Sequence, residues 1–122
     1  MAYILIVDDD PVLCRMFARR LQHAGYAIRM AHNGIEALKT IEEEMPSLII
    51  LDVYMPEMSG TELLEHLRES EAYHDVNVVL ITAASLTDED DRYRELADEF
   101  LTKPVSTREL LDTATKYLIR EI

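Results

Sequence analysis

Five side chains that could do chemistry stand directly after short apolar runs of this sequence. Asp8 and Asp9 follow YILIV, Asp52 follows SLIIL, Thr82 follows VVLI, and Lys103 follows EFLT. A fold that brings these positions together crowds three carboxylates. Two unit charges about 4 Å apart repel by about 4 kcal/mol at an effective dielectric near 20. A divalent cation relieves this repulsion, and Mg²⁺ typically binds one or two carboxylates while it keeps several waters.

A phosphoryl group would complete the charge balance of such a site. The metal and Lys103 would hold its oxygens, the hydroxyl of Thr82 would donate to a third oxygen, and a carboxylate could attack phosphorus. Taken singly, Asp8 and Asp9 could be turn residues and Thr82 could bond to the backbone. Lys103 could equally be a surface lysine that enters a turn. Their shared position after apolar runs favours a phosphoryl site.

The elements that must position these residues are short strands alternating with helices. Five apolar runs predict strands: Tyr3 to Val7, Ala27 to Met30, Leu48 to Leu51, Val76 to Ile81 and Glu99 to Thr102. The third and fourth runs are continuous rather than alternating, which is typical of parallel strands covered on both faces. We therefore predict an α/β fold, a doubly wound five-stranded parallel sheet with right-handed crossovers. In such sheets, sites form beyond the carboxyl ends of the strands.

Helix starts are indicated after each strand. Asp10 is placed to cap the first helix, with Pro11 at its first position and Gly25 at its end. Four further pairs, each a polar cap with an acid three residues later, indicate the other helices: Asn33 with Glu36, Ser59 with Glu62, Thr87 with Asp90, and Ser106 with Glu109. The sequence thus predicts a helix after every strand.

Length and composition limit the class of protein. A chain of 122 residues with 48% hydrophobic and 30% charged residues is one globular domain. The net charge of −12 argues against direct nucleic-acid binding and suits a cation or a basic protein surface. No apolar run is long enough to cross a bilayer and no secretory signal is present, so we expect a cytoplasmic protein without membrane insertion.

The single cysteine and the histidines are not assigned to the site. Cys14 falls on the apolar stripe of the first helix, where a small buried hydrophobe is its ordinary role. The four histidines do not follow the runs that carry the candidate site residues, and we interpret them as surface or structural: His23, His32, His66 and His74. Neither residue type is needed for the predicted chemistry.

Four segments together resemble the receiver domain of two-component response regulators. They are VDDDP, LDVYMPEMSG, ITAAS and FLTKP, in this order and spacing along the whole chain. The resemblance implies a flavodoxin-like (βα)5 fold with the strand order 2-1-3-4-5. It also implies that residues 1–122 are one receiver domain without an effector domain, similar to stand-alone, chemotaxis-regulator-like members of the family. A domain excised from a longer regulator would look the same.

The resemblance also implies roles for the site residues. Asp52 would accept a phosphoryl group from a phosphohistidine on a sensor histidine kinase or a histidine phosphotransfer protein. Asp9, Asp52 and the backbone carbonyl of Tyr54 would bind Mg²⁺, with Mn²⁺ as an alternative, and Asp8 would act mainly through a bound water. Thr82 and Lys103 would hold the phosphoryl oxygens.

Further positions are implied to control switching. Phe100 would be the aromatic switch residue that moves when Thr82 is drawn toward the phosphoryl group, changing the surface of the fourth helix, fifth strand and fifth helix. That surface would control a downstream protein or a phosphorylation-dependent dimer, or the phosphoryl group would be relayed onward. Tyr54 and Ala84 would modulate phosphoryl lifetime, and the peptide bond before Pro104 is expected to be cis.

Two other classes remain open. A metal-dependent phosphatase also attacks phosphorus with an aspartate after a strand, but such enzymes resemble a DxD arrangement, and Tyr54 stands at the second acidic position. A receiver used purely as an interaction module typically lacks the acceptor, an acid or the lysine, and this chain has all of them. Phosphorylation of Asp52 separates a working receiver from an interaction module, whereas Tyr54 at the second acidic position argues against the phosphatase.

Overall fold

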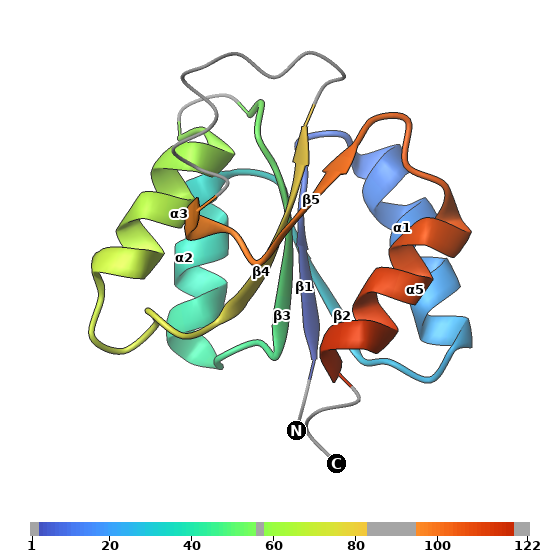
Figure 1. The fold of residues 1–122 in the computed structure, drawn as a ribbon, viewed down its shortest axis with the longest axis horizontal. Helices are drawn as coiled ribbons and strands as arrows, with labels where there is room; N and C mark the ends of the chain where they lie inside the picture. The colour runs from blue at the N-terminus through green and yellow to red at the C-terminus, as the bar shows by residue number, and fades with distance from the viewer. Residues whose placement is uncertain (1–2, 56–57, 83–94, 119–122) are drawn as a thin grey trace.

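The computed structural model describes residues 3–55, 58–82 and 95–118, and it forms a parallel sheet between two layers of helices (Figure 1). The strand order is β2-β1-β3-β4-β5, and all four neighbouring pairs are parallel. In chain order the elements are β1 (Ile4–Val7), α1 (Pro11–His23), β2 (Ile28–Ala31), α2 (Gly34–Glu43), β3 (Leu48–Asp52), α3 (Gly60–Glu69), β4 (Asn77–Thr82), β5 (Glu99–Thr102) and α5 (Thr107–Leu118). The predicted fold class and strand order are confirmed.

The strand bounds differ from the prediction by one residue in most cases. The first strand begins at Ile4 rather than Tyr3. The second, third and fourth strands span Ile28–Ala31, Leu48–Asp52 and Asn77–Thr82, and the fifth, Glu99–Thr102, has the predicted bounds. Pairing explains the observed bounds of the second strand, because β2 pairs with β1 in a register that aligns Ile4 with Ile28 and Val7 with Ala31. The helix predicted near Thr87 lies outside the described residues.

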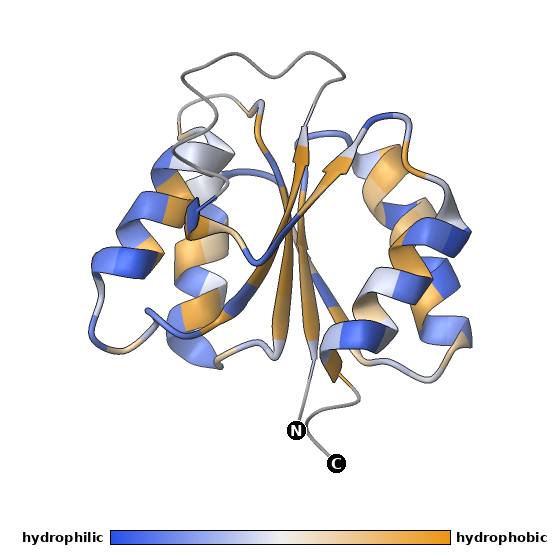
Figure 2. Ribbon diagram, viewed as in Figure 1, coloured by the Kyte–Doolittle hydropathy of each residue, from blue (hydrophilic) through white to orange (hydrophobic). Residues whose placement is uncertain are grey.

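The central strands supply side chains to both helical layers. Leu5 and Val7 of β1 belong to the core beneath α2 and α3, whereas Ile4 and Ile6 belong to the core beneath α1 and α5. All of β1 and β3 is buried, and the central strands form the most apolar part of the ribbon (Figure 2). Burying one such side chain contributes about 1.5–3 kcal/mol, so this double-sided core holds the strand ends in place.

The predicted caps start the helices that flank the site. Asp10 Oδ1 accepts hydrogen bonds from the backbone N–H groups of Val12 and Leu13, at 2.9 and 3.3 Å. Asn33, Ser59 and Ser106 likewise accept from the backbone N–H three residues later. Satisfying these otherwise unpaired donors contributes about 1 kcal/mol per helix, and these four of the five predicted caps are confirmed.

One arginine joins the amino ends of β4 and β5 to α3. Arg68 Nε donates to the carbonyl of Leu96 at 2.7 Å, and Nη1 donates to the carbonyls of His74 and Val76 at 2.9 and 2.7 Å. Arg68 Nη2 lies 3.1 Å from a carboxylate oxygen of Asp98. This guanidinium therefore holds the edge of the sheet opposite to the candidate site. Within the described ranges, no helix has the length and apolar character needed to cross a bilayer.

Candidate functional site

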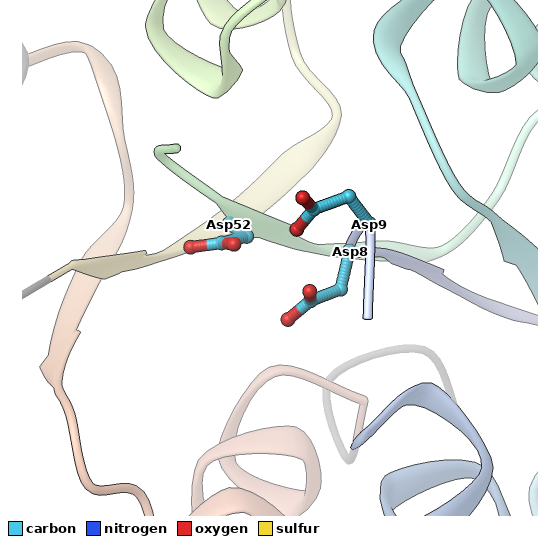
Figure 3. Close-up of side chains that lie close together, drawn as sticks. All are labelled: Asp8, Asp9 and Asp52. Atoms are coloured by element: carbon cyan, nitrogen blue, oxygen red, sulfur yellow. The ribbon is translucent and has the colours of Figure 1, made fainter. Parts of the chain in front are cut away.

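Three carboxylates meet at the carboxyl ends of β1 and β3. Asp8 and Asp9 directly follow β1, and Asp52 is the last residue of β3. Oxygen atoms of the three side chains lie within 4.8 Å of one another (Figure 3). Because β1 and β3 pair in parallel, their carboxyl ends share one edge of the sheet, as the sequence predicted.

Two of the three carboxylates are almost completely buried. Asp52 is 2% exposed and Asp8 is 3% exposed, whereas Asp9 is exposed. Lys103 Nζ lies 3.2 Å from Asp52 Oδ1, close enough for an ion pair. No donor among the described residues, Lys103 included, meets this buried oxygen with hydrogen-bond geometry. The site therefore holds more negative charge than its lysine balances, and one of its acceptors is unsatisfied.

Burial sets the electrostatics of these acids. It raises the pKa of Asp52, and the Lys103 ammonium and the backbone N–H of Tyr54 offset only part of that rise. Burial also raises the pKa of Asp8 to about 6, with the charge of Asp52 adding to the rise and the backbone N–H of Asp10 opposing it. Both carboxylates are thus costly to ionise without a cation, which is a property expected of a metal site.

These residues fit a hard divalent cation. The available donors are carboxylate oxygens, which Mg²⁺ prefers, and the unsatisfied Asp52 Oδ1 offers a lone pair that the protein does not use. Asp9 faces solvent, so a bound ion could keep several of its waters. The acidic cluster therefore supports the predicted Mg²⁺ site.

The backbone of Asp8 is held by side chains that the sequence analysis did not assign to the site. Its carbonyl oxygen lies 3.2 Å from His32 Nδ1 and accepts from Cys14 Sγ at 3.3 Å. Cys14 is fully buried, as expected for a core residue. His32 directly follows β2, the one strand end that the sequence analysis did not consider, and this position was the signal that could have identified it.

Gly60 is a second residue that sequence reasoning did not single out. A Cβ atom at this position would lie 2.1 Å from the backbone carbonyl oxygen of Asp52. The N–H of Gly60 donates to the carbonyl of Val53 at 2.9 Å. Only glycine allows α3 to begin this close to the end of β3, so Gly60 helps to determine where Asp52 lies.

The remaining predicted residues occupy the same edge of the sheet. Thr82 ends β4 and is 1% exposed, and its carbonyl accepts from the N–H of Lys103 at 2.8 Å. The peptide bond between Lys103 and Pro104 is cis, the form implied by the resemblance. Phe100 is partly buried against the core beneath α2 and α3, and Tyr54 is 60% exposed. Ala84 lies outside the described residues.

Known proteins are similar over almost the whole chain. The profile of the response regulator receiver domain matches residues 4–115. The polar-differentiation response regulator DivK of Brucella anthropi is 29% identical over 116 residues, which are 94% of each protein. The signal receiver domain of a histidine kinase from Syntrophus aciditrophicus is 33% identical with a TM-score of 0.90, covering 98% of this chain and 92% of that one.

A further similar structure is that of a complex. The response regulator TrrA of Thermotoga maritima, in complex with Mg²⁺ and BeF, is 36% identical with a TM-score of 0.84. The similarity covers 97% of this chain and all of that one. The chain belongs to the response regulator receiver domain family, whose members act as phosphorylation-dependent switches in two-component signalling.

Proposed function

We propose that Asp52 accepts a phosphoryl group from a phosphohistidine of a sensor histidine kinase or a histidine phosphotransfer protein. The observation that carries this proposal is the buried, unsatisfied Asp52 Oδ1, which lies 3.2 Å from Lys103 Nζ beside two further carboxylates. A carboxylate oxygen of Asp52 forms a bond to phosphorus as the P–N bond of the donor breaks. The electron pair of that bond stays on the imidazole nitrogen, which takes up a proton, and the product is an acyl phosphate.

The neighbouring residues stabilise the group that is transferred. Lys103 binds a phosphoryl oxygen through its ammonium, and the hydroxyl of Thr82 donates to another. Asp9, Asp52 and the carbonyl of Tyr54 hold Mg²⁺, for which Mn²⁺ is the alternative, and Asp8 acts through a water. Bound Mg²⁺ supplies the positive charge that lets anionic carboxylates and phosphoryl oxygens approach one another. The catalysis is limited to the protein's own phosphorylation and dephosphorylation.

The switch acts through β5 and α5. Movement of Thr82 toward the phosphoryl group frees space on the side of the partly buried Phe100, whose backbone pairs with Leu80 of β4. A changed position of this ring changes the surface that a downstream protein contacts, or supports a phosphorylation-dependent dimer. The size of this population shift is limited by the difference in contact energy between the two positions. A relay of the phosphoryl group to another histidine is the alternative output.

The test is intact mass spectrometry after incubation with acetyl phosphate, with and without Mg²⁺. We expect one phosphoryl adduct on the wild type that needs Mg²⁺ and is absent from Asp52→Asn. Asp75→Asn is the matched control, because that side chain is 88% exposed and lies outside the acidic cluster. An adduct that persists on Asp52→Asn would contradict the proposal. No adduct on folded wild type with either acetyl phosphate or phosphoramidate would favour a pure interaction module.

A further inference from the structure

We propose that His32, together with Cys14, is a positioning residue that fixes the turn formed by Asp8 and Asp9 for binding of a divalent cation. This inference rests on the metal site of the proposed function and names a residue that controls its affinity. His32 is half-buried and directly follows the edge strand β2. Cys14 is fully buried in α1. The two side chains reach the same backbone atom from different elements.

That atom is the carbonyl oxygen of Asp8. His32 Nδ1 lies 3.2 Å from it, and Cys14 Sγ donates to it at 3.3 Å. A carbonyl oxygen only accepts hydrogen bonds, so Nδ1 of His32 carries the hydrogen. The oxygen has two lone pairs and can accept from both donors at once. A thiol is the weaker donor of the two, so His32 provides the stronger restraint.

The other polar groups of Asp8 are restrained as well. Its N–H donates to the carbonyl of Ala31 at 3.1 Å, and its carboxylate oxygen Oδ1 accepts from the N–H of Asp10 at 2.9 Å. Asp9 differs, because its side chain is exposed to solvent. The carbonyl of Asp8 belongs to the peptide unit that joins it to Asp9. Holding this carbonyl therefore orients Asp9 through the backbone.

Electrostatic repulsion explains why this restraint matters. The three carboxylates stand within 4.8 Å of one another, and like charges at such distances favour any motion that separates them. Asp9 is exposed whereas Asp8 and Asp52 are buried, so rotation of Asp9 is the motion that this repulsion favours. A turn held by His32 and Cys14 keeps the cluster together before the cation arrives. Less of the binding free energy is then spent on ordering the ligands.

The test compares three variants with the wild type by Mg²⁺ titration calorimetry. His32→Phe keeps a ring but removes the donor. His32→Asn keeps a donor, because its Nδ2 is as many bonds from the backbone as Nδ1 of histidine. His74→Phe is the matched control, since His74 Nδ1 also lies close to a backbone carbonyl, that of Glu71 at 3.0 Å, away from the site. Circular dichroism and urea unfolding without metal report the fold of each variant.

We expect Mg²⁺ to bind His32→Phe about tenfold more weakly, as is usual when a group that orients a metal ligand is lost. His32→Asn should restore most of the affinity, and His74→Phe should bind as the wild type does. Amide hydrogen exchange at Asp10, whose N–H donates to Asp8 Oδ1, should become faster in His32→Phe alone. Where the larger ring prevents folding, His32→Ala takes its place in the comparison.

Other outcomes separate this inference from the proposed function. Equal Mg²⁺ affinity in the wild type and a folded His32→Phe would overturn the positioning role and leave the metal site intact. A loss of stability without a change in affinity would have the same meaning, because the histidine would then be structural only. A wild type that binds no Mg²⁺ but still forms the Asp52 adduct would overturn the metal site and, with it, this inference.

Discussion

Replacing Asp8 by asparagine should make the metal-free protein more stable at neutral pH. Asp8 is 3% exposed, and burial raises its pKa from an ordinary 3.8 to about 6. The folded protein therefore disfavours the ionised carboxylate that it contains at pH 7. An asparagine has nearly the same shape, and its Oδ1 can still accept the hydrogen bond from the N–H of Asp10. It removes the charge and keeps the contact.

The magnitude follows from the two pKa values. Below pH 3.8 the carboxyl is protonated in both states, and its contribution to stability is fully present. As the pH rises to about 6 the unfolded chain releases the proton and the folded chain retains it, so stability is lost across this window and no further above it. At about 1.4 kcal/mol per unit of pKa, the full loss is about 3 kcal/mol. Because the charged cluster can relax, we expect Asp8→Asn to gain about 1–3 kcal/mol.

The assay is urea unfolding with a chelator present, from pH 4 to pH 8, on the wild type and Asp8→Asn. The difference in the free energy of unfolding should grow between pH 4 and pH 6 and then stay constant. Mg²⁺ should raise the stability of the wild type and raise that of Asp8→Asn less. Asp75→Asn should follow the wild type at every pH. A gain that does not change with pH, or a net loss of stability at pH 7, would refute the reasoning.

Four further changes have defined outcomes. Arg68→Met should lower the free energy of unfolding in urea by about 2–4 kcal/mol, because four hydrogen bonds of a largely buried guanidinium are lost; a loss under about 1 kcal/mol would contradict it. Gly60→Ala should cost about 1–3 kcal/mol and slow adduct formation at Asp52, since the new Cβ would displace its carbonyl. Tyr54→Asn should speed the decay of the acyl phosphate, measured by mass against time, and unchanged or slower decay would show that the exposed tyrosine does not limit water access. Mg²⁺ affinity in calorimetry should fall as the pH drops below about 6, because Asp8 must lose a proton to bind; constant affinity would place Asp8 outside the metal site.

Local sequence patterns were sufficient to predict the elements that the structure describes and the edge at which the site forms. Strands and caps depend on neighbours within a few residues, so apolar runs indicated all five strands and Asp10 was identified as a helix cap. Asp52 and Lys103 were found because each follows an apolar run, and parallel strands place such ends at one edge. The order of the strands came from the resemblance to receivers rather than from periodicity.

Exact strand ends were less predictable, because pairing rather than composition determines them. Polarity placed the end of the second strand at Met30, whereas its register with β1 continues the ladder to Ala31. That single residue places His32 directly at the strand end, where it contacts the carbonyl of Asp8. A histidine interpreted as surface or structural therefore became a candidate for positioning the metal site.

The sequence by itself determined which chemical groups this protein has and on which edge of the sheet they stand. Only the tertiary structure decided how they interact: the 3.2 Å contact between Lys103 and Asp52, the unsatisfied oxygen, and the raised pKa of Asp8. Distances of this kind depend on how the sheet and both helical layers pack, and a pKa depends on the water that this packing excludes. Residues far apart in the chain determine both the distances and the pKa values, so a local sequence pattern does not predict either.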